Sequence, residues 1–161
     1  MSEFPHTLKI VTVWMVVGLL IFLGFKVHEH RQQRTRFEAD GEVVTLRRAA
    51  DGHYHWPGTI NGVPVDFLVD TGATGTALPA GLARAARLET GGTVTSSTAG
   101  GLATGTLATA DLELQGGVRA SRLRVVVLPG LDGALLGMDV LGRLRISQQG
   151  DTLTIDLRDQ R

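Results

Sequence analysis

The chain has 161 residues, about the length of one domain. It carries 16 Lys and Arg against 16 Asp and Glu, so it has no net basic charge of the kind that binds nucleic acid. It contains no cysteine, which excludes a disulfide scaffold, a cysteine nucleophile and thiolate metal sites. The charge balance therefore predicts no nucleic-acid partner. We also expect no metal site and no cofactor.

An uncharged apolar segment lies near the amino terminus. Residues 10–25 (IVTVWMVVGLLIFLGF) contain no charged side chain, and Lys9 and Lys26 flank them. A helix of this length measures about 24 Å, and flanking lysines that extend to the interfaces bring it close to the thickness of a bilayer core. No small-residue cleavage site for a signal peptidase follows. The sequence predicts a tail at 1–9 and a single transmembrane anchor at 10–25, through which the chain contacts the lipid bilayer.

The segment after the anchor is polar. Residues 26–40 contain no Gly or Pro, which favours a helical stalk or a solvated linker. Four basic residues lie between positions 26 and 36, and by the positive-inside rule they favour a cytoplasmic location for whatever follows. Only Gly18 and Gly24 precede residue 41, so 19 of the 21 glycines lie in the predicted domain, residues 41–161.

This domain is predicted to consist of short strands joined by tight turns. Asn61-Gly62, between strands expected at 53–60 and 63–69, is the strongest hairpin signal in the chain. Pro79 begins a predicted helix over 79–88, and a second short helix is expected from Asp139. Further strands are expected at 42–46, 93–98, 106–114, 118–128, 144–146 and 153–157. The pattern predicts an all-β domain, a small closed barrel or sheet with one or two short helices.

Asp70 is the residue that most needs an explanation. It directly follows Phe67-Leu68-Val69, an apolar run expected to be buried on both faces, and it precedes Thr71-Gly72. A buried carboxylate without partners is costly. One interpretation is a catalytic carboxylate, and the other is a turn-forming Asp that accepts a hydrogen bond from the backbone.

Two further motifs accompany it. In Leu135-Leu136-Gly137, the glycine allows another part of the chain to approach closely. Asp139 is expected to cap the short helix that follows and is not expected to be catalytic. A hairpin with Gly100 and Gly101 at its tip suits a mobile flap, although an ordinary surface loop has the same composition.

Together these motifs resemble the retropepsin-like aspartic proteases, and in particular their single-domain, membrane-anchored bacterial members. The resemblance covers nearly all of residues 41–161. It implies a closed barrel of the acid-protease type and a homodimer that hydrolyses polypeptides. It also suggests a bacterial inner-membrane protein whose protease domain lies in the periplasm, in contrast to the charge pattern.

The resemblance also implies roles for individual residues. Asp70, Thr71 and Gly72 form the catalytic motif, which Ala73, Thr74 and Gly137 support from behind. Four residues form the flap that closes over the peptide: Thr98, Ala99, Gly100 and Gly101. Two carboxylates must share one proton for aspartic peptide hydrolysis, and the chain has one Asp-Thr-Gly, so the second carboxylate must come from another copy.

Two other functions are compatible with parts of the pattern. A membrane-tethered β domain that binds extended peptides without cutting them uses the same strands, but it has no need for Asp70. A phosphate-binding loop of the actin type also has Asp-x-Gly-x-x-Gly after a strand, as in residues 70–75. That fold requires two α/β halves and a much longer chain, which excludes it here.

Overall fold

A computed structural model of the chain describes residues 11–22, 36–39, 43–98 and 101–158. The chain divides into two compact units, Met1–Arg34 and Thr35–Arg161. In the first unit residues 11–22 are helical. Among the described residues, no helix has both the length and the apolar character needed to span a membrane. The transmembrane anchor at 10–25 therefore stays a prediction.

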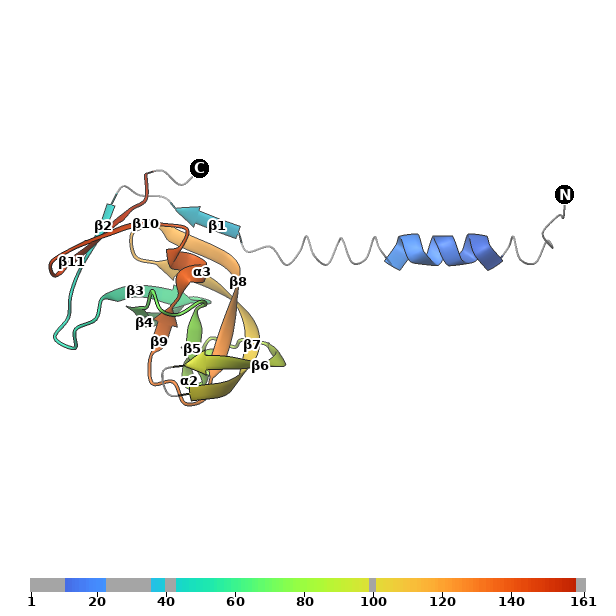
Figure 1. Ribbon diagram of the computed structural model, residues 1–161, viewed down its shortest axis with the longest axis horizontal. Coiled ribbons are helices and arrows are strands. Elements are labelled where there is room, and N and C mark those ends of the chain that lie inside the picture. Colours follow the sequence, from blue (N-terminus) through green and yellow to red (C-terminus); the bar gives the residue numbers. More distant parts are fainter. Residues whose placement is uncertain (1–10, 23–35, 40–42, 99–100, 159–161) are drawn as a thin grey trace. The chain divides into compact units, whose positions relative to one another are not determined.

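The second unit consists almost entirely of strands (Figure 1). Its elements in chain order are β1 (Arg36–Ala39), β2 (Val43–Arg47), β3 (His55–Ile60), β4 (Val63–Val69), β5 (Ala77–Pro79), α2 (Ala80–Ala85), β6 (Thr90–Thr98), β7 (Gly101–Leu114), β8 (Val118–Leu128), β9 (Ala134–Leu136), α3 (Met138–Leu141), β10 (Arg145–Gln149) and β11 (Thr152–Asp156). The prediction of an all-β domain with short helices is confirmed.

The main sheet closes into a barrel. Its strand order is β1-β8-β5-β9-β4-β3-β7-β6, and β8 also pairs with β7, so six strands from β8 round to β7 form a closed ring. Two pairs in this ring, β4 with β9 and β5 with β8, are parallel. Strands β10, β11 and β2 form a separate antiparallel sheet, in which β11 is central. The predicted closed barrel is therefore present.

Two segments differ from the sequence predictions. The described part of the predicted stalk, Arg36–Ala39, is not helical: it is strand β1 and pairs with β8. The helix predicted over residues 79–88 is shorter, because Pro79 ends strand β5 and lies before the helix in an extended conformation. The helix stops at Ala85 because Arg87 has a positive φ of 51°, and the amide of Leu88 then donates to the Ala83 carbonyl across the end of the helix.

Trp56 of β3 is the largest side chain that is completely buried in the core. Its indole Nε1 donates a hydrogen bond of 2.8 Å to the carbonyl oxygen of Gln115. Replacement by alanine removes both the packing and the donor, so we expect Trp56→Ala to lower the free energy of unfolding by about 3–5 kcal/mol. Urea unfolding of the full chain in detergent measures the loss. Leu102→Ala, at a side chain that is 81% exposed, is the control and should change it by less than about 0.5 kcal/mol.

His55, the first residue of β3, lies between two carboxylates: Asp51, which precedes that strand, and Asp66 of β4. Its Nε2 is 2.8 Å from Asp51, and its Nδ1 is 3.1 Å from Asp66. The hydrogen bond to Asp51 and the charges of both carboxylates raise the pKa of His55 above its ordinary value of 6.5, against the opposing effect of partial burial. A histidine with a raised pKa stabilises the fold below pH 6.5 and loses this contribution as the pH rises through the raised value.

We therefore expect the urea midpoint to be higher at about pH 6 than at about pH 8, and His55→Gln to reduce this difference. His53→Gln is the matched control, because the His53 ring is 3.7 Å from Asp51 and 55% exposed. An equal pH dependence in wild type and His55→Gln would show that these ion pairs do not affect stability.

Candidate active site

The parallel pairing of β4 with β9 brings the two apolar motifs together. Phe67, Leu68 and Val69 lie opposite Ala134, Leu135 and Leu136. Parallel strands end at the same edge of a sheet, so Asp70 and Gly137 leave their strands side by side. The amide of Asp70 donates a hydrogen bond of 3.0 Å to the carbonyl of Leu136, which ties the start of the loop to β9.

Residues 70–76, called the Asp70 loop below, connect β4 to β5. The Asp70 side chain is half-buried, and its Oδ1 accepts a hydrogen bond of 2.8 Å from the amide of Gly72. The Ala73 amide donates to the Asp70 carbonyl at 3.2 Å. These bonds form the Asx-type turn that the sequence allows. They also fix the carboxylate at the start of the loop. Only Oδ1 accepts the Gly72 amide bond, so Oδ2 is left for chemistry, and the turn is compatible with catalysis.

The burial of the preceding strand is more uneven than predicted. Phe67 is completely buried, whereas Leu68 and Val69 are half-buried. Thr71 and Gly72 are exposed. The reason is that β4 reaches the rim of the barrel at its end, where the Asp70 loop emerges toward solvent.

Gly137 lies directly against the Asp70 loop. A Cβ atom added to Gly137 would be 2.4 Å from the carbonyl carbon of Gly75 and 2.5 Å from its oxygen. The close approach expected for this glycine is therefore present. Thr74 is exposed. Among the described residues, the hydrogen bond to the Asp70 carboxylate is donated by the Gly72 amide and not by Thr74. An orienting role for Thr74 stays a prediction.

The predicted flap is a long β-hairpin. Strands β6 and β7 pair in antiparallel register up to Thr98 opposite Gly101. Ala99 and Gly100, the predicted tip of the flap, lie outside the described residues. Leu102, next to the tip, is the most exposed large apolar side chain of this hairpin.

Comparison with known proteins decides the family. Residues 56–143, which span the Asp70 loop, the flap hairpin and Gly137, match the family described as gag-polyprotein putative aspartyl protease. The chain belongs to this family. It is accordingly an aspartic-type endopeptidase with the retropepsin-like fold that the sequence predicted. No curated protein matches the chain.

A solved structure shows the same fold. The crystal structure of a retropepsin-like aspartic protease from Rickettsia conorii is 23% identical and superimposes with a TM-score of 0.57 over 76% of this chain and 93% of that one. The EIAV protease in complex with the inhibitor HBY-793 is 21% identical, with a TM-score of 0.49 over 58% of this chain and 88% of that one.

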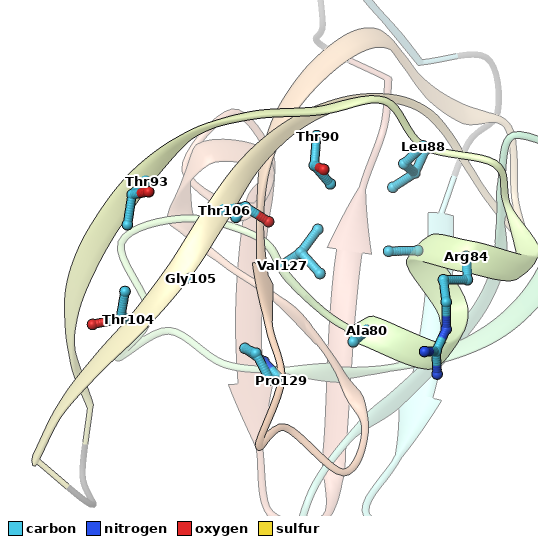
Figure 2. Close-up of a pocket in the computed structure, with 11 residues that line it drawn as sticks. Ala80, Arg84, Leu88, Thr90, Thr93, Thr104, Gly105, Thr106, Val127 and Pro129 are labelled. Atoms are coloured by element: carbon cyan, nitrogen blue, oxygen red, sulfur yellow. The ribbon is translucent and has the colours of Figure 1, made fainter.

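The protease has a cavity of about 450 Å³ at the base of the flap hairpin (Figure 2). The lining residues come from α2 and the segment after it, from β6 and β7, and from the end of β8 and the loop after it. They include Ala80, Leu88, Val127 and Pro129. No residue of the Asp70 loop lines it. Within the described ranges no cluster of three His, Asp or Glu side chains is arranged to hold a metal ion.

Sequence reasoning missed the role of Asp139. The residue before α3 that caps the helix is Gly137, and Asp139 lies in the first turn. Its carboxylate accepts hydrogen bonds of 2.9 Å from both the amide and the hydroxyl of Thr76, at the end of the Asp70 loop. The prediction of Asp139 as the helix cap is therefore wrong. Thr76 lies 63 positions away, so no local pattern could have revealed the contact.

Proposed function

We propose that the chain is a membrane-anchored aspartic endopeptidase that is active as a homodimer. The observation that carries the proposal is the Asp70 loop: one Asp-Thr-Gly, supported by β9 and Gly137, with its catalytic motif at the molecular surface. One such loop supplies one carboxylate, and the chemistry needs two. Two-fold symmetry supplies the second from an identical loop.

Exposure of the loop supports this arrangement. Thr71 and Gly72 are exposed beside the half-buried Asp70. A partner loop that covers them brings its own Asp70 next to the first without rearranging the barrel. In the proposed dimer Thr71 bonds across the symmetry axis, and Gly72 keeps the loops close. Ala73, Thr74 and Gly137 support each catalytic motif, residues 70–72, from behind.

The reaction follows from a pair of carboxylates that share one proton. The ionised carboxylate takes a proton from a bound water while the water oxygen forms a bond to the carbonyl carbon of the peptide. The protonated carboxyl donates a hydrogen bond to the carbonyl oxygen, on which negative charge develops. The tetrahedral species then breaks down: the bond between its carbon and the peptide nitrogen breaks, and one of the two carboxyls gives its proton to the leaving amine. The pair is thereby left with one shared proton, as at the start. Thr98, Ala99, Gly100 and Gly101 form the flap that covers the peptide.

The membrane anchor at residues 10–25 serves the same mechanism. Anchoring two chains in one bilayer raises their effective concentration and favours the dimer. We place the anchor in a bacterial inner membrane with the protease domain in the periplasm. Reporter fusions at Arg161 test the orientation: a periplasm-dependent reporter should be active, and activity of a cytoplasm-dependent reporter alone would reverse the assignment.

Dilution of the full chain in detergent tests the dimer. Specific activity on a peptide library should rise with protein concentration and level off where sedimentation shows a dimer. A statine-containing peptide, which mimics the tetrahedral species, should inhibit cleavage and stabilise the dimer. Cleavage with constant specific activity by a species of monomer mass would refute the homodimer.

A further inference from the structure

The carboxylate of Asp139 points at the end of the Asp70 loop. Its Oδ2 accepts a 2.9 Å hydrogen bond from the amide of Thr76, and its Oδ1 accepts a 2.9 Å bond from the Thr76 hydroxyl. Thr76 has no exposed surface. Among the described residues it is the only buried one of a polar or charged type. Asp139 is half-buried on α3. Both polar groups that Thr76 presents to this side are therefore bound by one carboxylate.

The segment that carries Asp139 holds the same loop at three other points. Leu136 accepts the amide bond from Asp70 at the start of the loop, and the amide of Met138 donates a 2.8 Å bond to the carbonyl of Ala73 in the middle. Gly137 packs against the backbone of Gly75. Asp139 completes the set at the far end. The contacts with Leu136, Gly137 and Met138 use backbone groups, and Asp139 alone acts through its side chain.

Stabilisation of helix α3 alone does not explain why Asp139 is a carboxylate. The helix is four residues long, and its cap position, Gly137, makes no side-chain hydrogen bond. Asp139 also accepts a 3.0 Å bond from the Val140 amide, but that amide donates to the Gly137 carbonyl at 3.2 Å as well. The helix therefore has backbone partners without Asp139. The Thr76 hydroxyl donates its proton to Asp139 at 2.9 Å, and its oxygen accepts a longer bond of 3.4 Å from the Gly137 amide.

We propose that Asp139 and Thr76 form a clamp that positions the Asp70 loop for catalysis, with both acting as positioning residues. The inference rests on the proposed catalytic role of Asp70. A pair of carboxylates that share a proton tolerates little displacement, because a shift of about 1 Å in a reacting group can cost about 100-fold in rate. Without the clamp, residues 70–76 are held by backbone contacts alone, and Asp70 no longer keeps a single position.

Paired variants of the full-length protein test the clamp. Thr76→Val removes the hydroxyl and keeps the shape. We expect it to lower kcat about tenfold, mainly through loss of the 2.9 Å bond to Asp139, with little change in KM. Asp139→Ala removes both acceptors and should lower kcat about 100-fold. The double variant should lose no more than Asp139→Ala alone, because the two residues act as a unit.

Conservative variants provide the controls. Thr76→Ser keeps the hydroxyl and should restore kcat to near the wild-type value. Asp139→Asn should do the same, because its carbonyl oxygen accepts from the Thr76 amide and its amide group donates to the Thr76 oxygen. Failure of both conservative variants to restore kcat, or an additive double variant, would overturn the clamp.

A measurement without substrate separates this inference from the catalytic assignment. Hydrogen exchange of the Asp70 loop amides should be faster in Asp139→Ala than in wild type, with the core strands β3 and β8 unchanged. Unchanged exchange in the loop would overturn the clamp even in an active enzyme. If wild type cleaves no peptide but the loop exchange responds as expected, the clamp stands and the proposed function is what fails.

Discussion

Replacement of Asp70 by asparagine is expected to abolish peptide cleavage without unfolding the protein. Asparagine has nearly the same size, and its carbonyl oxygen can accept the bond that Oδ1 accepts from the Gly72 amide. It can neither take the proton from water nor share a proton with a second carboxylate. Loss of general acid–base catalysis by both chains of a dimer should lower kcat by about 1,000-fold or more. Peptide-library digestion followed by mass spectrometry measures the loss.

Asp132→Asn is the matched control for this variant. Asp132 lies on the exposed loop before β9, carries the same charge and undergoes the same substitution. The Asp132→Asn variant should cleave peptides at the wild-type rate. Undiminished cleavage by Asp70→Asn, with a wild-type urea midpoint, would show that Asp70 is not the catalytic carboxylate.

Gly137→Ala is expected to have the second-largest effect. The added Cβ would lie within 2.8 Å of three backbone atoms of Gly75, and backbone cannot rotate away as a side chain can. Either the Asp70 loop or α3 must move. We expect a loss of about 1–3 kcal/mol in the free energy of unfolding and a fall in kcat of about 100-fold, because the displaced loop carries Asp70.

The control for Gly137→Ala is Gly133→Ala, just before the same strand. A Cβ at Gly133 meets nothing within 4 Å, so both stability and kcat should remain at the wild-type values. If Gly137→Ala were as active and as stable as Gly133→Ala, the close packing of β9 against the Asp70 loop would have no functional role.

The sequence predicted those parts of the fold that local patterns encode. The β3–β4 hairpin is the clearest example: Asn61 and Gly62 both have positive φ, as a tight two-residue hairpin turn requires, and the strands begin and end close to the predicted positions. The β7–β8 pair follows the alternation of apolar and polar residues in the same way. The motif at Asp70 was identifiable because a carboxylate at the end of an apolar strand is costly without a purpose.

The parts that were missed depend on partners far away in the chain. Strand β1 (RFEA) is a four-residue alternation within a polar segment, too short to stand out from its surroundings, and it pairs with β8, about eighty positions later. Strands β5 and β9 have three residues each and are fixed mainly by parallel neighbours. Asp139 has the local signature of a helix cap, and its bonds to Thr76 arise only after β9 has brought α3 to the Asp70 loop.

Mixed dimers provide the most direct test of the central claim, that two chains each supply one Asp70 to a single site. Wild-type and Asp70→Asn chains with different tags are co-expressed in equal amounts, mixed dimers are verified by tandem purification, and cleavage is measured at constant total protein. Only dimers of two wild-type chains should cleave, so random pairing predicts about one quarter of the wild-type activity. About one half, the value for chains that act independently, would contradict a shared active site.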